Sequence, residues 1–226
     1  MKLEERIALI FFTAIYIPLI IIQFLVYLNK IKIPKLNYKK FLIYNIIILL
    51  FGIIGFFVLS HTNYLDYEKP ISYSEYKRIS FQNFRGLELF KKTFQGSEYF
   101  AYVVTSIEIN NKNNSIEAYF HPSRSFVYNK KSRSKDLLTH ELYHFKITEL
   151  FARKARKEII ENKISNFDKR TEILNRILED EKKFQQMYDY ETSHSYVYFK
   201  QLAFEKEIDS LLLTLNIYEN PKIEYR

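Results

Sequence analysis

The chain has 226 residues, with 34 Lys and Arg against 26 Asp and Glu, which gives a net charge of +8. It contains no cysteine, so disulfides, thiolate metal sites and cysteine nucleophiles are excluded. Most of the basic excess lies in residues 1–60, whose net charge is +5, while residues 61–226 carry the remaining +3. Because the longer part is nearly balanced, we expect no nucleic-acid partner.

Two long apolar segments lie near the N-terminus. Residues 7–28 and residues 41–60 contain no charged side chain over 22 and 20 positions. A helix of either length crosses a hydrocarbon core of about 30 Å. Residues 1–60 are therefore predicted to form a transmembrane hairpin, with a kink at Pro18 that a membrane helix tolerates.

The loop between the two segments predicts how the hairpin is oriented. Residues 29–40 contain five lysines and no acidic residue. Short loops with an excess of lysine stay in the cytoplasm. We therefore expect both chain termini, and the domain of residues 61–226, on the outer side of the cytoplasmic membrane.

The first half of that domain reads as strands. Apolar and polar residues alternate over 99–109 and again over 116–120, with a polar turn between them, which predicts a β-hairpin. Another short strand is expected within residues 71–84.

The second half reads as about three helices. Ser134 is a suitable N-cap for a helix that runs to about residue 162, with Asp136 in its first turn. Apolar residues surround the first five turns of this helix, so it should be buried, whereas its charged end, residues 153–163, should emerge into solvent. Further helices are expected from about residue 168 and from about residue 192. Strands followed by helices define an α+β class.

The first of these helices carries the motif His140-Glu141-Leu142-Tyr143-His144. Residues four apart on a helix point the same way, so both imidazoles can bind one ion, and Glu141 can approach a metal-bound water. Two unpaired imidazoles on an apolar helix would cost several kcal/mol, a cost that a bound metal offsets. The motif therefore predicts a zinc site.

A zinc site of this kind needs a third protein ligand and a water. The remaining histidines are His61, at the end of the second apolar segment, His121, at the end of a predicted strand, and His194, between the second and third helices. Glu191 lies one helical turn before His194 and is an alternative, because some zinc enzymes use Glu as the third ligand.

Residues 70–213 resemble the predicted secreted Zn-dependent proteases of bacteria, a family long described as a domain of unknown function. The resemblance rests on the segments "ISYSEYKRISF", "EAYFHPSRSFV", "LLTHELYHFKITELFARKARKE" and "YDYETSHSYVYFKQLAFEKEI". It implies a zincin-like fold and favours His194 as the third ligand, since Tyr188, Asp189, Thr192 and His194 match a Tyr-Asp…Thr-x-His-Gly element. The chain departs from the family pattern at Ser195, where glycine is usual, and at His121 and Lys146, where aspartate is usual.

Together these features predict a membrane-anchored zinc peptidase. Zn²⁺ on His140, His144 and His194 would acidify its bound water, and Glu141 would act as the general base on a peptide or protein substrate. The expected oxyanion or substrate contacts are Tyr143, Tyr188, Tyr190 and His121. The alternative is a non-enzymatic membrane-anchored module that binds metal as a sensor or partner-binding domain.

Overall fold

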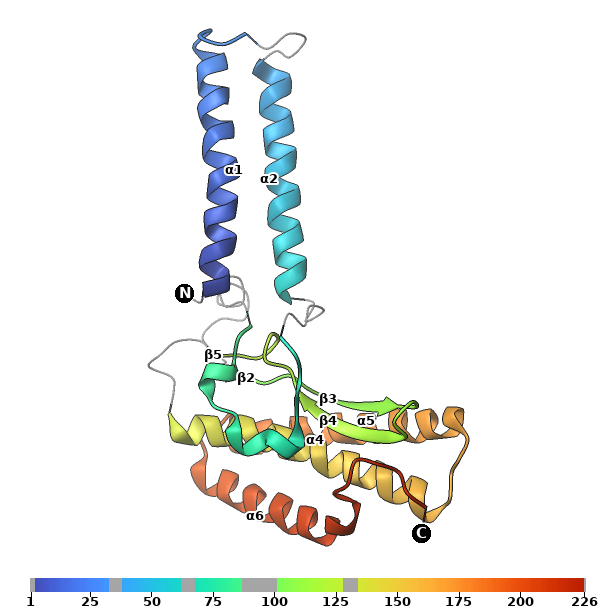
Figure 1. The fold of residues 1–226 in the computed structure, drawn as a ribbon. Coiled ribbons are helices and arrows are strands. Elements are labelled where there is room, and N and C mark those ends of the chain that lie inside the picture. Colours follow the sequence, from blue (N-terminus) through green and yellow to red (C-terminus); the bar gives the residue numbers. More distant parts are fainter. Residues whose placement is uncertain (1–2, 33–37, 62–67, 87–100, 128–133, 226) are drawn as a thin grey trace. The chain divides into compact units, whose positions relative to one another are not determined.

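A computed structural model places most of the chain in two compact units (Figure 1). The residues that it describes are 3–32, 38–61, 68–86, 101–127 and 134–225. One unit comprises residues 1–65 with 87–96, and the other comprises residues 66–86 with 97–226.

The first unit is a pair of apolar helices, α1 (Leu3–Tyr27) and α2 (Tyr38–His61), which lie side by side in Figure 1. Both are long and apolar enough to cross a membrane. Inside the pair, Asn45 donates to Gln23 Oε1 at 2.7 Å, and the Asn45 carbonyl accepts from Tyr16 at 2.9 Å. Polar bonds of this kind hold helices together in lipid. The two predicted apolar helices are confirmed.

The second unit has one small sheet of three antiparallel strands in the order β1-β4-β3. These strands are β1 (Ile71–Ser72), β3 (Thr105–Asn110) and β4 (Ser115–Phe120). The predicted hairpin is confirmed in β3 and β4, where Ile107 lies opposite Ala118 and both are buried. Two short 3₁₀ helices, Tyr73–Arg78 and Phe81–Asn83, follow the expected strand β1.

The predicted strand over 99–109 is not continuous. Its beginning lies outside the described residues, and β2 (Ala101–Tyr102) pairs instead with β5 (Phe126–Val127) in a separate two-stranded sheet. Between β2 and β3, the backbone of Val104 bonds to the loop after β4: its N–H donates to Ser125 Oγ and its carbonyl accepts from the His121 N–H, both at 2.9 Å. The bond to His121 continues the register of β3 and β4, but the bond to Ser125 takes the Val104 N–H out of the ladder, and alternation of residue types does not reveal this.

Three helices complete the second unit: α4 (Lys135–Glu161), α5 (Phe167–Thr192) and α6 (Tyr198–Thr214). A 3₁₀ turn, Asn216–Tyr218, follows them. As predicted, Ser134 caps α4 by accepting from the Leu137 N–H at 3.0 Å. The third helix was expected from about residue 192 but begins at Tyr198, because residues 193–195 have left-handed backbone. The mixed α+β class is confirmed.

Helix α4 contacts β3 and β4 as well as α5 and α6, so it lies at the centre of the second unit (Figure 1). Its buried apolar side chains include Phe145, Ile147 and Leu150, each at 0% exposure. A residue surrounded by strands on one side and helices on the other has a fixed position. The histidine motif is thus carried by the most constrained element of the fold.

The charged second half of α4 reaches solvent only in part: Lys157 and Glu161 are exposed as expected, whereas Arg153 and Arg156 are buried. Glu149 Oε1 accepts from Arg153 Nε at 2.9 Å and from Arg156 Nη2 at 2.6 Å, and all three residues are buried. Arg156 also donates to the carbonyls of Tyr218 and Ile116, both at 2.7 Å. Because buried charges persist only when they are paired and hydrogen-bonded, this network ties α4 to β4 and to the C-terminal turn.

Candidate metal centre

His140 and His144 lie one turn apart on α4 with their Nε2 atoms 3.3 Å apart. Two nitrogens bound to zinc at about 2.0–2.1 Å in a tetrahedron are separated by about 3.3 Å. Their rings are nearly perpendicular, at 88°. The two imidazoles therefore already have the separation of two ligands of one ion.

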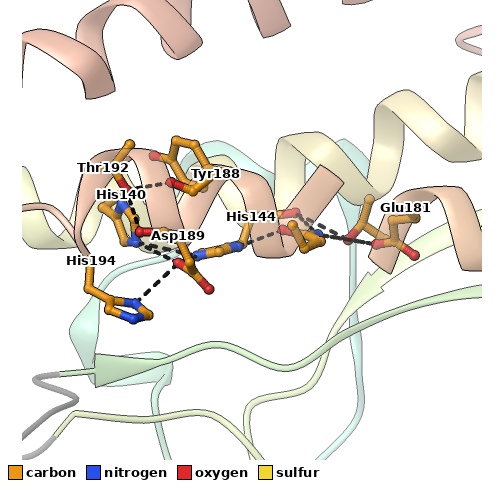
Figure 2. Close-up of polar contacts among 9 residues, drawn as sticks. His140, His144, Glu181, Tyr188, Asp189, Thr192 and His194 are labelled. Carbon is orange, nitrogen blue, oxygen red and sulfur yellow. Dashed lines mark hydrogen bonds and ion pairs between the residues drawn. The ribbon is translucent and has the colours of Figure 1, made fainter. Parts of the chain in front are cut away.

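Helix α5 brings a carboxylate to the same point. Asp189 Oδ1 lies 3.2 Å from His140 Nε2 and 2.9 Å from His144 Nε2 (Figure 2). The ligand atoms of these three residues all lie within 4.8 Å of one another, so the group could hold a metal ion. We call His140, His144 and Asp189 the donor group.

His194 pairs with Asp189 at the edge of the donor group. Its Nδ1 lies 3.3 Å from Asp189 Oδ1, its side chain is 41% exposed, and it is not a member of the donor group. It sits in the turn between α5 and α6, where Ser193, His194 and Ser195 have φ of 46°, 52° and 78°. Three successive left-handed residues are costly for L-amino acids and often accompany functional sites. The predicted role of His194 as a ligand stays a prediction.

Tyr188 supports both imidazoles of the motif. Its ring stacks on His140 at 4.7 Å and 16°, and meets His144 edge-on at 5.1 Å and 79°. Tyr188 is fully buried, and its own ring packs edge-on against Phe204 of α6. Tyr188 therefore supports the two histidines by packing against their rings (Figure 2), and its predicted oxyanion or substrate contact stays a prediction.

Glu141 lies beside the donor group and is 5% exposed. Burial raises the pKa of its carboxyl to about 7, with Asp189 acting in the same direction and His144 and a backbone hydrogen bond from Val103 opposing it. A carboxyl with a pKa near the working pH can both accept and return a proton. These are the properties that a general base requires.

The charges of the donor group are unequal. Burial lowers the pKa of His140 to about 4 despite its bond to Asp189. Burial acts the same way on His144, but the bond and charge of Asp189 outweigh it and raise the pKa of His144 to about 9. The same two histidines hold the pKa of Asp189 far below its usual range, against the effect of burial. Without a metal, the group is thus an ion pair of Asp189 and His144, and a cation must displace the proton of His144 to bind.

The other residues that the sequence put forward are not members of the donor group. Glu191, the alternative ligand, pairs with Lys200 at 3.0 Å. The Tyr143 hydroxyl donates to Asp209 Oδ2 at 2.9 Å. His121 Nε2 bonds to Ser106 Oγ at 2.8 Å. Tyr190 is 81% exposed, and the side chain of His61 lies outside the described part of the chain.

Sequence reasoning missed two residues of the site. Asp189 was noticed only as part of a family element, although it is two residues from Glu191 near the end of the same helix. Gln185, which bonds to His144 Nδ1 at 2.5 Å, was not considered. Gln185 and Asp189 are four apart and therefore share one face of α5, but this spacing does not show that the shared face meets the histidines of α4.

Comparison of the chain with models of known protein families, with curated proteins and with solved structures finds no match. The interpretation of the site therefore rests on its own geometry and chemistry.

Proposed function

We propose that the chain is a membrane-anchored zinc-dependent peptidase, with its metal held by His140, His144 and Asp189. The observation that carries the proposal is the convergence of three donor atoms from two helices next to a buried carboxyl, Glu141. A zincin-like identity for the domain and the resemblance to predicted secreted proteases are part of the same proposal.

The donor set fits a catalytic zinc ion. Two imidazoles and one carboxylate are ligands that zinc accepts, and three protein ligands leave a fourth position for a water. Structural zinc sites usually fill all four positions and favour cysteine, which this chain lacks. The chemistry that zinc supplies when bound is the acidification of a water and the polarisation of a carbonyl. These features favour a hydrolase over a metal-binding sensor.

Side chains of the protein would transfer the proton and hold the metal ligands in place. Glu141 accepts a proton from the attacking water and returns it to the amine nitrogen that leaves as the amide C–N bond breaks. Its burial keeps the carboxyl out of bulk water, where it would ionise at a lower pH. Tyr188 holds the two imidazoles by stacking, and the fold of α4 fixes the spacing between base and ligands.

His194 is the rival for the third ligand position. It reaches the Asp189 oxygen but not the donor group as a whole, so we assign the position to Asp189. In this arrangement the imidazole of His194 pairs with the carboxylate from outside. A site of three histidines is the alternative that metal analysis of single variants distinguishes.

The two apolar helices support the membrane anchor. We propose that α1 and α2 span the cytoplasmic membrane, with the lysine-rich loop inside the cell and the domain of residues 61–226 outside. Peptides and proteins outside the membrane would then be the substrates.

The test is hydrolysis of a mixed peptide pool by the full chain in mild detergent, with new termini identified by mass spectrometry. We expect cleavage that stops with a chelator, returns with zinc and is lost in Glu141→Gln. The control is Glu179→Gln, an exposed residue of α5. A chain that binds zinc but cleaves no peptide would refute the peptidase and favour the sensor or partner-binding module.

A further inference from the structure

Gln185 of α5 makes a two-sided contact with His144. Its Oε1 lies 2.5 Å from His144 Nδ1, and its Nε2 donates to the His144 carbonyl at 3.0 Å. One amide side chain thus bonds to both the ring and the backbone of a single residue on the neighbouring helix. This contact is on the side of the imidazole opposite to the donor group.

The orientation of the Gln185 amide follows from its partners. Its Nε2 faces two acceptors, the His144 carbonyl and Glu181 Oε1 at 3.2 Å, so this atom must be the nitrogen. The oxygen therefore faces His144 Nδ1, which must carry a hydrogen to donate. In the neutral ring this leaves the lone pair on Nε2, the atom that points at Asp189 and His140.

The contact continues into a buried hydrogen-bonded chain. Glu181 Oε1 accepts from Thr148 Oγ1 at 2.7 Å as well as from Gln185. Thr148 in turn bonds to Thr105 Oγ1 of β3 at 2.7 Å. A carboxylate on the amide nitrogen polarises the amide and makes its oxygen a stronger acceptor. The chain therefore links β3, α4 and α5 to one imidazole.

His140 is held in a different way. Its Nδ1 is buried and has no hydrogen-bond partner among the described residues. The stack on Tyr188 is what fixes its ring. Of the two imidazoles, it is His144 whose Nδ1 has a polar partner among the described residues.

We infer that Gln185, polarised by Glu181, is the positioning residue that fixes His144 in its metal-binding tautomer and orientation. The inference rests on the proposed metal site and deepens it. Metal-bound histidines commonly donate their second N–H to a carboxylate or a carbonyl. Here a glutamine amide stands between the carboxylate and the imidazole, so Glu181 acts on His144 through Gln185 in addition to its direct electrostatic effect.

The test compares the affinity of full-length variants in detergent for Co²⁺ and Zn²⁺, by competition with a chelator of known affinity. Gln185→Leu should weaken binding by about 10–100-fold, the usual effect of losing such a partner, and should change the visible spectrum of bound Co²⁺. Gln186→Leu is the matched control, because Gln186 is the exposed neighbour on the same helix, and it should change neither.

A double-mutant cycle separates this role from packing. Glu181→Gln should weaken binding by a smaller factor in the wild-type background and should lose most of this effect in Gln185→Leu, because the part of its influence that passes through the amide is then absent and only the direct electrostatic part remains. Two results would overturn the inference about Gln185 but leave the proposed metal site standing. One is additivity of the effects of Glu181→Gln and Gln185→Leu on affinity, and the other is a Co²⁺ affinity and spectrum unchanged in Gln185→Leu. A wild-type chain that binds neither metal would overturn the proposed metal site, and the inference with it.

Discussion

Replacing Glu141 by Gln should have opposite effects on hydrolysis and on stability. The amide keeps the size of the side chain but cannot take up a proton from water. Hydrolysis should therefore fall by about 10²–10⁴, the usual contribution of a general base. The fold should not suffer, because the substitution removes a buried group that ionises at a cost.

The stability gain can be worked from the pKa of Glu141, which burial raises from 4.5 to about 7. As pH rises through 4.5 the carboxyl ionises in the unfolded chain but stays protonated in the folded one, so the free energy of unfolding falls. The loss is complete once pH exceeds the folded-state pKa. At about 1.4 kcal/mol per pKa unit, the metal-free wild type should be less stable than Glu141→Gln by about 3 kcal/mol above that pH, and equally stable at pH 4.

The assay is urea unfolding of the chelator-treated full chain in detergent at pH 4 and pH 8. Pulse proteolysis measures the unfolded fraction at each urea concentration. The difference between wild type and Glu141→Gln should appear only at pH 8 and should shrink when zinc is added. Equal stability at pH 8 would mean that the buried charge is fully compensated without metal. Unchanged peptide cleavage by the variant would refute the role of Glu141.

Three further predictions concern the rest of the chain. Since the chain lacks cysteine, single cysteines report topology: with a membrane-impermeant thiol reagent on intact cells, Asn113→Cys should label and Lys35→Cys, which lies outside the described residues, should not. Arg156→Met should lower the free energy of unfolding by about 3–5 kcal/mol, because it removes one partner of buried Glu149 and leaves two carbonyls unpaired; urea unfolding measures this. Ser195→Gly should raise the unfolding midpoint by an amount equivalent to about 1 kcal/mol, because φ at this position is 78°.

Each of these three predictions has an outcome that would contradict it. If the reagent labels Lys35→Cys but not Asn113→Cys, the chain has the opposite orientation in the membrane. For Arg156→Met the control is Arg176→Met, which breaks an exposed pair with Glu158 and should lower the free energy of unfolding far less. Equal losses in the two variants would show that the buried network contributes no more than a surface pair. A lower midpoint for Ser195→Gly would mean that the serine side chain compensates for its backbone.

Most of the fold could be predicted from local patterns in the sequence. The apolar runs of α1 and α2, the alternation in β3 and β4 and the Ser134 cap each depend on neighbours in the sequence, and each was predicted. The burial of Arg153 and Arg156 was not, because it depends on Glu149 and on three carbonyls from distant segments. A charged run is normally a solvated helix face, and only tertiary contacts reverse that expectation.

The residues of the candidate site could likewise be predicted only in part. His140, Glu141 and His144 could be read directly because the motif encodes its own geometry on one helix. Asp189 and Gln185 could not, since their place depends on the rotation of α5 against α4. The start of α6 at Tyr198 was not predicted either. The turn before it has left-handed backbone but contains no glycine that would indicate this in the sequence.

The metal content of single variants tests the central claim most directly. The full chain in detergent is loaded with zinc, dialysed against a weak chelator and analysed by mass spectrometry for zinc per chain. We predict about one zinc in the wild type and in Glu191→Ala, whose carboxylate pairs with Lys200, and almost none in His144→Ala or Asp189→Ala. An empty site in His194→Ala with a full one in Asp189→Ala would replace the carboxylate by a third histidine, and a wild type without zinc would contradict the metal centre altogether.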